Sequence, residues 1–289
     1  MTREPPWLLG LDLGPRCSGA LQFARMLRER LHVRVVGVFV SEMWPLALPP
    51  GEGTALALSL RDEAGSSLAT MPTADPGAAV DTTRIVDAVD AETGLSAAAR
   101  EAAGVVLGRR VASTGAWTRL GRVARRLLRR LPAPVIIVPP ELANDEFAGP
   151  VMLATDITDS SAAAARFAVA FARELGRPLV CVHVGQPRWD GSYGLLEPRR
   201  DELRATYREA TERATRDWAT RHCPDAELTH EYGDPVERLV ALAEHVRPSL
   251  LVLGTGRPGM VERIFTGSTA STVAAAAPCA VAVVPSVAP

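Results

Sequence analysis

Short apolar segments recur along the second half of the chain and alternate with segments of helical periodicity. Predicted strands lie at residues 151–156, 178–184, 226–232, 250–254 and 280–284, and all but the short third one are mainly apolar. The continuous apolar run at 178–184 is typical of a strand buried on both faces of a parallel sheet. Helical segments lie between them, at 160–175, 199–221 and 235–246. This alternation predicts a parallel, doubly wound α/β sheet with right-handed crossovers.

The first half follows the same plan less sharply. Its predicted strands lie at 7–12, 33–40, 83–86, 104–108 and 134–138. The segment between residues 41 and 81 is rich in proline, glycine and alanine. We therefore expect an altered second helix and a longer loop there.

The two halves are copies of one pattern. In each half the first strand ends in an aspartate, and these residues, Asp12 and Asp156, are 144 positions apart. Three further landmarks share an offset of 146, namely Gly108 with Gly254, Gly121 with Gly267, and the proline-bounded strand of 132–139 with that of 278–285. A constant offset across three landmarks indicates a duplicated domain. We predict domains at residues 1–141 and 149–289, separated by the polar stretch 141–149.

The basic residues exclude several chemistries. All 32 of them are arginine, so the sequence contains no lysine. There is no residue for a lysine-bearing phosphate loop, for a Schiff base, or for the ATP-positioning site of a protein kinase. A GC-rich genome, which favours arginine codons, is a simple explanation of this bias. The exclusion of lysine chemistry holds whatever the origin of the bias.

Charge and cysteine usage narrow the class of protein further. The formal net charge of −1 argues against a dedicated nucleic-acid binder. The first six residues lack the apolar core of a secretion signal, and no apolar run reaches the roughly 20 residues that span a bilayer. The four cysteines have no metal-ligand or redox spacing. We expect a cytoplasmic protein with reduced, mostly buried thiols and no membrane partner.

The second half resembles the universal stress protein family over essentially its whole length. The motifs that carry the resemblance are the strand ending in Asp156, the strand ending in His183-Val184, Gly233-Asp234-Pro235 at a helix start, a glycine-rich loop leading to Gly267-Ser268, and the closing strand of 278–285. The first half is similar to a diverged copy, so the chain resembles a tandem universal stress protein. The resemblance implies two five-stranded Rossmann-like domains with strand order 3-2-1-4-5, forming a pseudo-dimer.

The resemblance also implies an ATP site in the second domain, with Mg²⁺ as a candidate ion bound to the phosphates. Its predicted residues are Ala154, Thr155, Asp156, Val184, Leu253, Gly254, Gly256, Arg257, Gly267, Ser268 and Thr269. ATP-binding members carry a loop of the form G-x-x-G, nine residues, then G-[ST]. Gly254 and Gly267-Ser268 match this loop, but Arg257 stands at its second glycine.

These residue types suit a nucleotide for physical reasons. Ligands of open parallel sheets bind beyond the carboxyl ends of the strands, where the strand order reverses. Asp156 would accept hydrogen bonds from ribose hydroxyls or from an adenine amino group there. The helix start at 267–269 would offer backbone N–H groups to phosphate.

Each of these roles has a plainer alternative. Asp156 would otherwise only cap the turn that follows it, and Ser268 would be an ordinary helix N-cap. Arg257 would contact phosphate or point into solvent. His183 is a satisfied core histidine or a ligand contact.

The first half departs from the nucleotide pattern. Val111 and Arg122 replace the second glycine and the hydroxyl of the loop, so we predict no nucleotide there, and Arg122 either binds an anion or plugs the pocket. Six arginines interleave with apolar residues at helical spacing, namely Arg119, Arg122, Arg125, Arg126, Arg129 and Arg130 with Leu120, Val123, Leu127, Leu128 and Leu131. We interpret 119–131 as a basic amphipathic helix, either a solvated face or a site for an acidic surface.

No catalytic constellation is evident, because the histidines form no triad or metal pattern and no nucleophile has a base partner. The resemblance implies an ATP-binding regulatory protein of the stress response, with at most weak ATP hydrolysis. The alternatives are a nucleotide-free interaction scaffold and a sensor of another small metabolite. The family resemblance also implies that the two domains pair within one chain through their fifth strands. A second copy of the chain and a regulatory protein are further expected partners.

Overall fold

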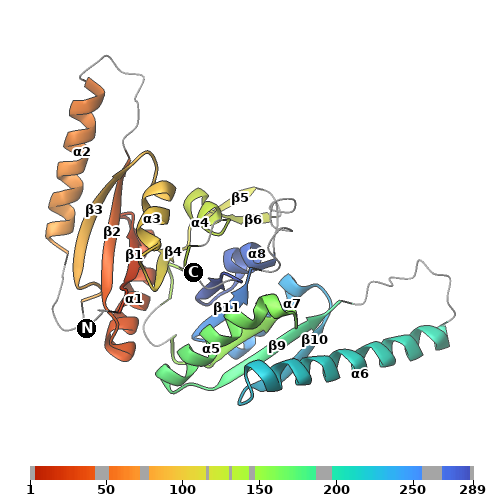
Figure 1. Ribbon diagram of the computed structural model, residues 1–289. Helices are drawn as coiled ribbons and strands as arrows, with labels where there is room; N and C mark the ends of the chain where they lie inside the picture. Colours follow the sequence, from red (N-terminus) through yellow and green to blue (C-terminus); the bar gives the residue numbers. More distant parts are fainter. Residues whose placement is uncertain are drawn as a thin grey trace. The chain divides into compact units, whose positions relative to one another are not determined.

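The computed structural model describes residues 4–42, 52–71, 78–114, 117–129, 132–142, 147–186, 197–255 and 269–286 (Figure 1). The chain divides into two compact units, one up to Phe147 and the other over Ala148–Val287. We refer to them as the first and second domains. The loop residues Gly256, Arg257, Gly267 and Ser268, which the sequence places in the ATP site, lie outside the described residues.

The first domain is built on a parallel sheet. Its parallel strands are β1 (Trp7–Leu11), β2 (Val35–Glu42), β3 (Thr82–Ala88), β4 (Gly104–Gly108) and β7 (Val135–Val138). They pair in the order β3-β2-β1-β4-β7. The helices are α1 (Ser18–Leu31), α2 (Glu52–Ala69), α3 (Ala91–Ala99) and the short α4 (Arg122–Leu127). An antiparallel pair, β5 (Val111–Thr114) and β6 (Trp117–Leu120), lies between β4 and α4.

The second domain repeats this plan. Its strands are β8 (Val151–Thr155), β9 (Leu179–Gly185), β10 (Glu227–Tyr232), β11 (Leu250–Gly254) and β12 (Val281–Val284). They pair in parallel in the order β10-β9-β8-β11-β12. The helices are α5 (Ala162–Leu175), α6 (Glu197–His222), α7 (Pro235–Val246) and α8 (Thr269–Ala276). The predicted doubly wound α/β class is therefore confirmed, and both domains follow the order 3-2-1-4-5.

Buried apolar strands form the core of each domain, as the continuous apolar runs predict. Leu8, Leu9 and Val105 in the first domain and Met152 and Leu251 in the second are at most 1% exposed. Each such side chain contributes about 1.5–3 kcal/mol through removal from water. Local signals set the helix starts as well. Asp234 accepts hydrogen bonds from the N–H groups of Val236 and Glu237, and Pro235 occupies the first turn of α7.

One expectation about the first domain needs correction. The segment 119–131 is not one basic amphipathic helix, because its first residues belong to β6 and the helix α4 covers only Arg122–Leu127. Backbone pairing with β5 overrides the helical spacing of arginine and leucine there. In the segment 41–81, where we expected an altered second helix and a longer loop, the structure has the 18-residue helix α2, and residues 43–51 and 72–77 lie outside the described residues.

Candidate functional site

The aspartate that ends the first strand is held in the same backbone turn in both domains. The following residue has a left-handed backbone in each copy, with φ of 56° at Leu13 and 57° at Ile157. One carboxylate oxygen, Oδ1, accepts a hydrogen bond from the N–H two residues further on, at 3.0 Å in both cases. The duplicated sequence therefore builds a duplicated carboxylate at the carboxyl edge of each sheet, beside the point where the strand order reverses.

In the second domain this turn is completed by two hydroxyl groups. Asp156 Oδ1 accepts hydrogen bonds from Thr158 Oγ1 at 2.7 Å and from Ser161 Oγ at 2.7 Å. Partial burial raises the pKa of Asp156, but the hydrogen bonds from Thr158 and Ser161 together hold it below its ordinary value. The predicted capping role is therefore present. Among the described residues all these bonds go to Oδ1 and none goes to Oδ2, which can accept a hydrogen bond from a ligand.

His183 supports the turn from the neighbouring strand. Its Nδ1 lies 2.8 Å from the backbone oxygen of Thr155, the residue opposite it in the sheet. This hydrogen bond favours the interpretation of His183 as a structural residue. From the other side, Trp218 of α6 donates from Nε1 to the backbone oxygen of Thr158 at 3.2 Å. The two contacts fix both ends of the segment that carries Asp156.

The structure brings the described site residues of the second domain to one edge. Ala154, Thr155 and Asp156 end β8, Val184 is the penultimate residue of β9, and Leu253 and Gly254 end β11. These three strands are neighbours. Thr269 is exposed and begins α8.

Glycine plays different roles at the two fourth-strand ends. A Cβ on Gly108 would lie 2.6 Å from the backbone oxygen of Arg16, so packing in the first domain requires glycine. A Cβ on Gly254 would lie 3.6 Å from Ser161 Cα, an ordinary contact. The described neighbours of Gly254 therefore do not require a glycine.

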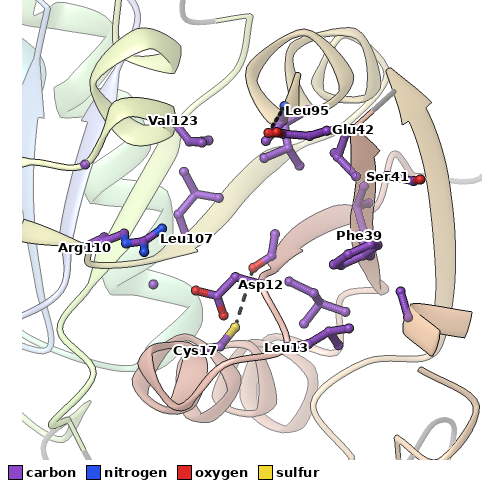
Figure 2. A pocket seen from close by; sticks show the side chains of 18 of the residues that line it. Asp12, Leu13, Cys17, Phe39, Ser41, Glu42, Leu95, Leu107, Arg110 and Val123 are labelled. Atoms are coloured by element: carbon purple, nitrogen blue, oxygen red, sulfur yellow. Dashed lines mark hydrogen bonds between the residues drawn. The ribbon is translucent and has the colours of Figure 1, made fainter. Parts of the chain in front are cut away.

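The first domain contains a cavity at this same edge, where the sequence left open whether Arg122 binds an anion or plugs a pocket. Its volume is about 850 Å³, within the range of small-molecule sites. It is lined by the ends of β1, β2 and β4 together with residues of α2, α3 and α4. Figure 2 shows Phe39, Leu95, Leu107 and Val123 forming its apolar walls. Arg122 also lines the cavity, with its side chain 51% exposed, so it does not plug the pocket.

The hairpin β5–β6 replaces the glycine-rich loop that the resemblance places after the fourth strand. Its ends are closed by a hydrogen bond of 2.5 Å from the Gly121 N–H to the Arg110 backbone oxygen. The ladder from Val111 opposite Leu120 to Thr114 opposite Trp117 continues from this bond. The hairpin thus uses part of the backbone groups that a phosphate-binding loop would present to a ligand. Two short alternating segments around 115–116 were the available sequence signal for this hairpin.

The aspartate turn of the first domain lacks the two hydroxyl donors. Gly14 and Cys17 occupy the positions of Thr158 and Ser161. The Cys17 thiol instead faces the backbone oxygen of Gly10 at 3.6 Å. Burial, with a smaller effect from the charge of Asp12, raises the pKa of Cys17 to about 11, so the thiol is neutral at physiological pH. Among the described residues, the hydrogen bond from Gly14 N–H is the one made to the Asp12 carboxylate.

Two arginines of α4 form ion pairs with carboxylates. Arg126 lies 2.7 Å from Glu92 and 3.5 Å from Asp90 at the start of α3. Arg122 lies 3.9 Å from Glu42, whose carboxylate also accepts a hydrogen bond from the Ala91 N–H. These ion pairs tie α4 to α3 and to the end of β2. They favour a structural role for these two arginines over a basic docking face.

Other classes of site find no support in the described part of the chain. None of its groups of His, Cys, Asp and Glu side chains has a geometry that could hold a metal ion. None of its helices combines the length and apolarity needed to cross a bilayer.

Comparisons with known proteins agree with the duplicated architecture. The sequence model of the Universal stress protein family matches residues 7–139 and 148–285. A universal stress protein from Archaeoglobus fulgidus DSM 4304 superposes with a TM-score of 0.67 at 19% identity, covering 98% of each chain. A structure from Pseudomonas aeruginosa UCBPP-PA14 gives a TM-score of 0.60 at 15% identity, covering 98% of this chain and 94% of that one.

A shorter structure, described as a universal stress protein in complex with cAMP, is 28% identical over 47% of this chain and 97% of its own, with a TM-score of 0.32. No curated protein matches the chain. Fold and site together define a tandem pair of doubly wound α/β domains, each with a carboxylate turn at its topological switch point. The chain belongs to the Universal stress protein family and carries two copies of its domain.

Proposed function

We propose that the second domain binds ATP and that the protein is a nucleotide-dependent regulator of the stress response rather than an enzyme. The observation that carries this proposal is the preorganised Asp156 carboxylate. Its Oδ1 is held by hydrogen bonds from Thr158 and Ser161, and its Oδ2, which accepts none from the described residues, would accept from a ribose hydroxyl or an adenine amino group. An ionised carboxylate fixed before binding loses little conformational entropy when the ligand arrives.

The remaining parts of the proposed site come from the sequence. The N–H groups and hydroxyls of 267–269 would hold the phosphates, since α8 begins at Thr269. Arg257 would add a charge-assisted contact and compensate for the missing second glycine. Mg²⁺, where present, would be bound mainly by the phosphates of ATP. No residue is proposed to act as a base or nucleophile, so any hydrolysis would be weak.

The test is a calorimetric titration of the full chain with ATP. We expect Asp156→Asn to weaken binding at least tenfold, because a charge-assisted hydrogen bond is lost. Asp12→Asn, the matched change in the first domain, should leave the affinity unchanged. Gly267→Asp should abolish binding by placing a negative charge at the phosphates. Absence of binding at millimolar ATP would contradict the proposal, and an unaffected Asp156→Asn variant would place the nucleotide elsewhere.

The alternative function is a nucleotide-free scaffold, which Arg257 at the second glycine position favours. It predicts no nucleotide released on denaturing the purified protein. We further propose, from the resemblance, that the domains pair through their fifth strands, Val135–Val138 and Val281–Val284, each of which has one parallel neighbour within its own domain. A homodimer, a regulatory partner and a cytoplasmic location remain predictions.

A further inference from the structure

The cavity of the first domain is chemically different from the ATP site proposed above. Five charged side chains line it, namely Asp12, Glu42, Glu63, Arg110 and Arg122. Three carboxylates against two guanidinium groups leave an excess of one negative charge. A triphosphate would add several more negative charges, and the ladder of hairpin β5–β6 uses part of the backbone N–H groups that would otherwise offset them. The lining therefore disfavours a polyanion.

Two opposite charges in this cavity have unused hydrogen-bonding capacity. Figure 2 shows the Asp12 carboxylate and the Arg110 guanidinium both directed into the cavity. Among the described residues, the Asp12 carboxylate accepts one bond, from Gly14, and the Arg110 guanidinium forms no ion pair with Asp12 or with another carboxylate. Glu42 and Arg122, by contrast, already face each other at 3.9 Å. Asp12 can receive an ammonium or hydroxyl donor, and Arg110 can receive one acid group.

Apolar walls complete the recognition surface around these two charges. Leu95 is 5% exposed and Leu107 is 6% exposed, and both contact the cavity from the side of α3 and β4. Phe39 lines it from β2. A ligand that satisfies all three features has a cationic donor, an apolar body and a single anionic group. The volume of about 850 Å³ exceeds that of one amino acid and admits a molecule of dipeptide size.

We propose that the cavity of the first domain binds a zwitterionic small molecule of amino-acid or dipeptide type, with its ammonium group on Asp12, its carboxylate on Arg110 and an apolar side chain against Phe39, Leu95 and Leu107. The site is independent of the ATP site in the second domain. It makes the two copies receptors for ligands of different charge.

The experiment is a calorimetric titration of the full chain with L-leucine, L-phenylalanine and L-leucyl-L-leucine at millimolar concentration. We expect at least one of these zwitterions to bind. N-acetylation, which removes the ammonium charge, and C-terminal amidation, which removes the carboxylate, should each weaken binding at least tenfold. Asp12→Asn and Arg110→Gln should weaken it similarly, and Arg110→Gln should have little further effect on the amidated ligand, which has no carboxylate to lose.

Matched controls separate this inference from the ATP proposal. Asp156→Asn in the second domain and Arg30→Gln on the exposed end of α1 should leave zwitterion binding unchanged. Failure of every zwitterion to bind, or binding that is indifferent to Asp12→Asn and Arg110→Gln, would overturn the inference. So would ATP binding that survives Asp156→Asn and disappears in Asp12→Asn, since the cavity would then be a nucleotide site.

Discussion

Individual hydrogen bonds to Asp156 have a measurable pH signature. Replacing Ser161 by alanine removes one of them and should raise the pKa of Asp156 towards its ordinary value. A lowered folded-state pKa stabilises the protein above the unfolded-state pKa, and this contribution is lost as the pH falls through the folded-state value. Because Asp156 is exposed, we expect a loss of only about 0.5–1 kcal/mol at neutral pH.

Urea unfolding at neutral pH and in acid measures this contribution. The difference in unfolding free energy between the parent protein and Ser161→Ala should shrink as the pH falls below 3.8, the ordinary pKa of an aspartate, because the Asp156 carboxyl then becomes protonated in both proteins. A difference that is constant with pH would mean that Ser161 stabilises the domain without acting through the charge of Asp156.

The two fourth-strand glycines provide a second prediction for single residues. Gly108→Ala should destabilise the protein by about 1–3 kcal/mol, because the new Cβ would press on the backbone oxygen of Arg16. Gly254→Ala should change stability by less than about 1 kcal/mol, because its Cβ finds room beside Ser161. Chemical unfolding of both variants checks this, and equal losses would show that the contrast in packing is not real.

Secondary-structure elements also differ in how firmly they are held, and α6 is the clearest case. Its second half buries Thr211, Thr215, Trp218 and Ala219, each at most 8% exposed, whereas residues 201–210 are exposed or half-buried. We expect amide hydrogen exchange to be slower in 211–222 than in 201–210. Trp218→Phe should narrow this difference, since it removes the hydrogen bond to Thr158. Uniform protection along α6 would contradict this view of its anchoring.

Regular elements were predictable from the sequence where local and tertiary preferences agree. The apolar strands and the Asp234-Pro235 helix start satisfy periodicity, capping and burial at once, so their positions follow from the residues. The region 111–131 was not predictable in this way. Arginine and leucine recur there at helical spacing, but Trp117–Leu120 pairs with Val111–Thr114, and cross-strand pairing has no local signature as strong as helical periodicity.

The candidate site likewise has a part that local sequence predicts and a part that depends on tertiary structure. A strand-ending aspartate can be recognised in the sequence, and the capping of the turn at Asp156 was one of the alternatives it offered. A pocket in the first domain was considered from the sequence, but its lining could not be predicted, because its walls come from β1, β2, β4, α2, α3 and α4, which are far apart in the chain. Cys17 stands in the first domain where Ser161 stands in the second, and the two turns share one backbone conformation. The loss of a hydroxyl donor to Asp12 follows from that shared conformation, which the sequence alone does not reveal.

At the scale of the whole molecule, the two domains should respond to ligands separately. ATP at about 100 times its dissociation constant stabilises the domain that binds it by about 2.7 kcal/mol. We expect ATP to slow hydrogen exchange in peptides from 148–287 and to leave those from 4–147 unchanged. Asp156→Asn should remove the effect, and Asp12→Asn should not. Protection of both domains by ATP would contradict the division of roles.

The paired aspartate turns have one further consequence. Leu13 and Ile157 have the same left-handed backbone, and each turn closes through one hydrogen bond of 3.1 Å, from Cys17 N–H to Gly14 O or from Ser161 N–H to Thr158 O. The duplication has therefore preserved the backbone of this turn, whereas the side chains that donate to the aspartate Oδ1 differ between the copies. Threonine at Gly14 and serine at Cys17 should therefore give Asp12 the two hydroxyl donors that Asp156 has, without a change in the backbone of the turn.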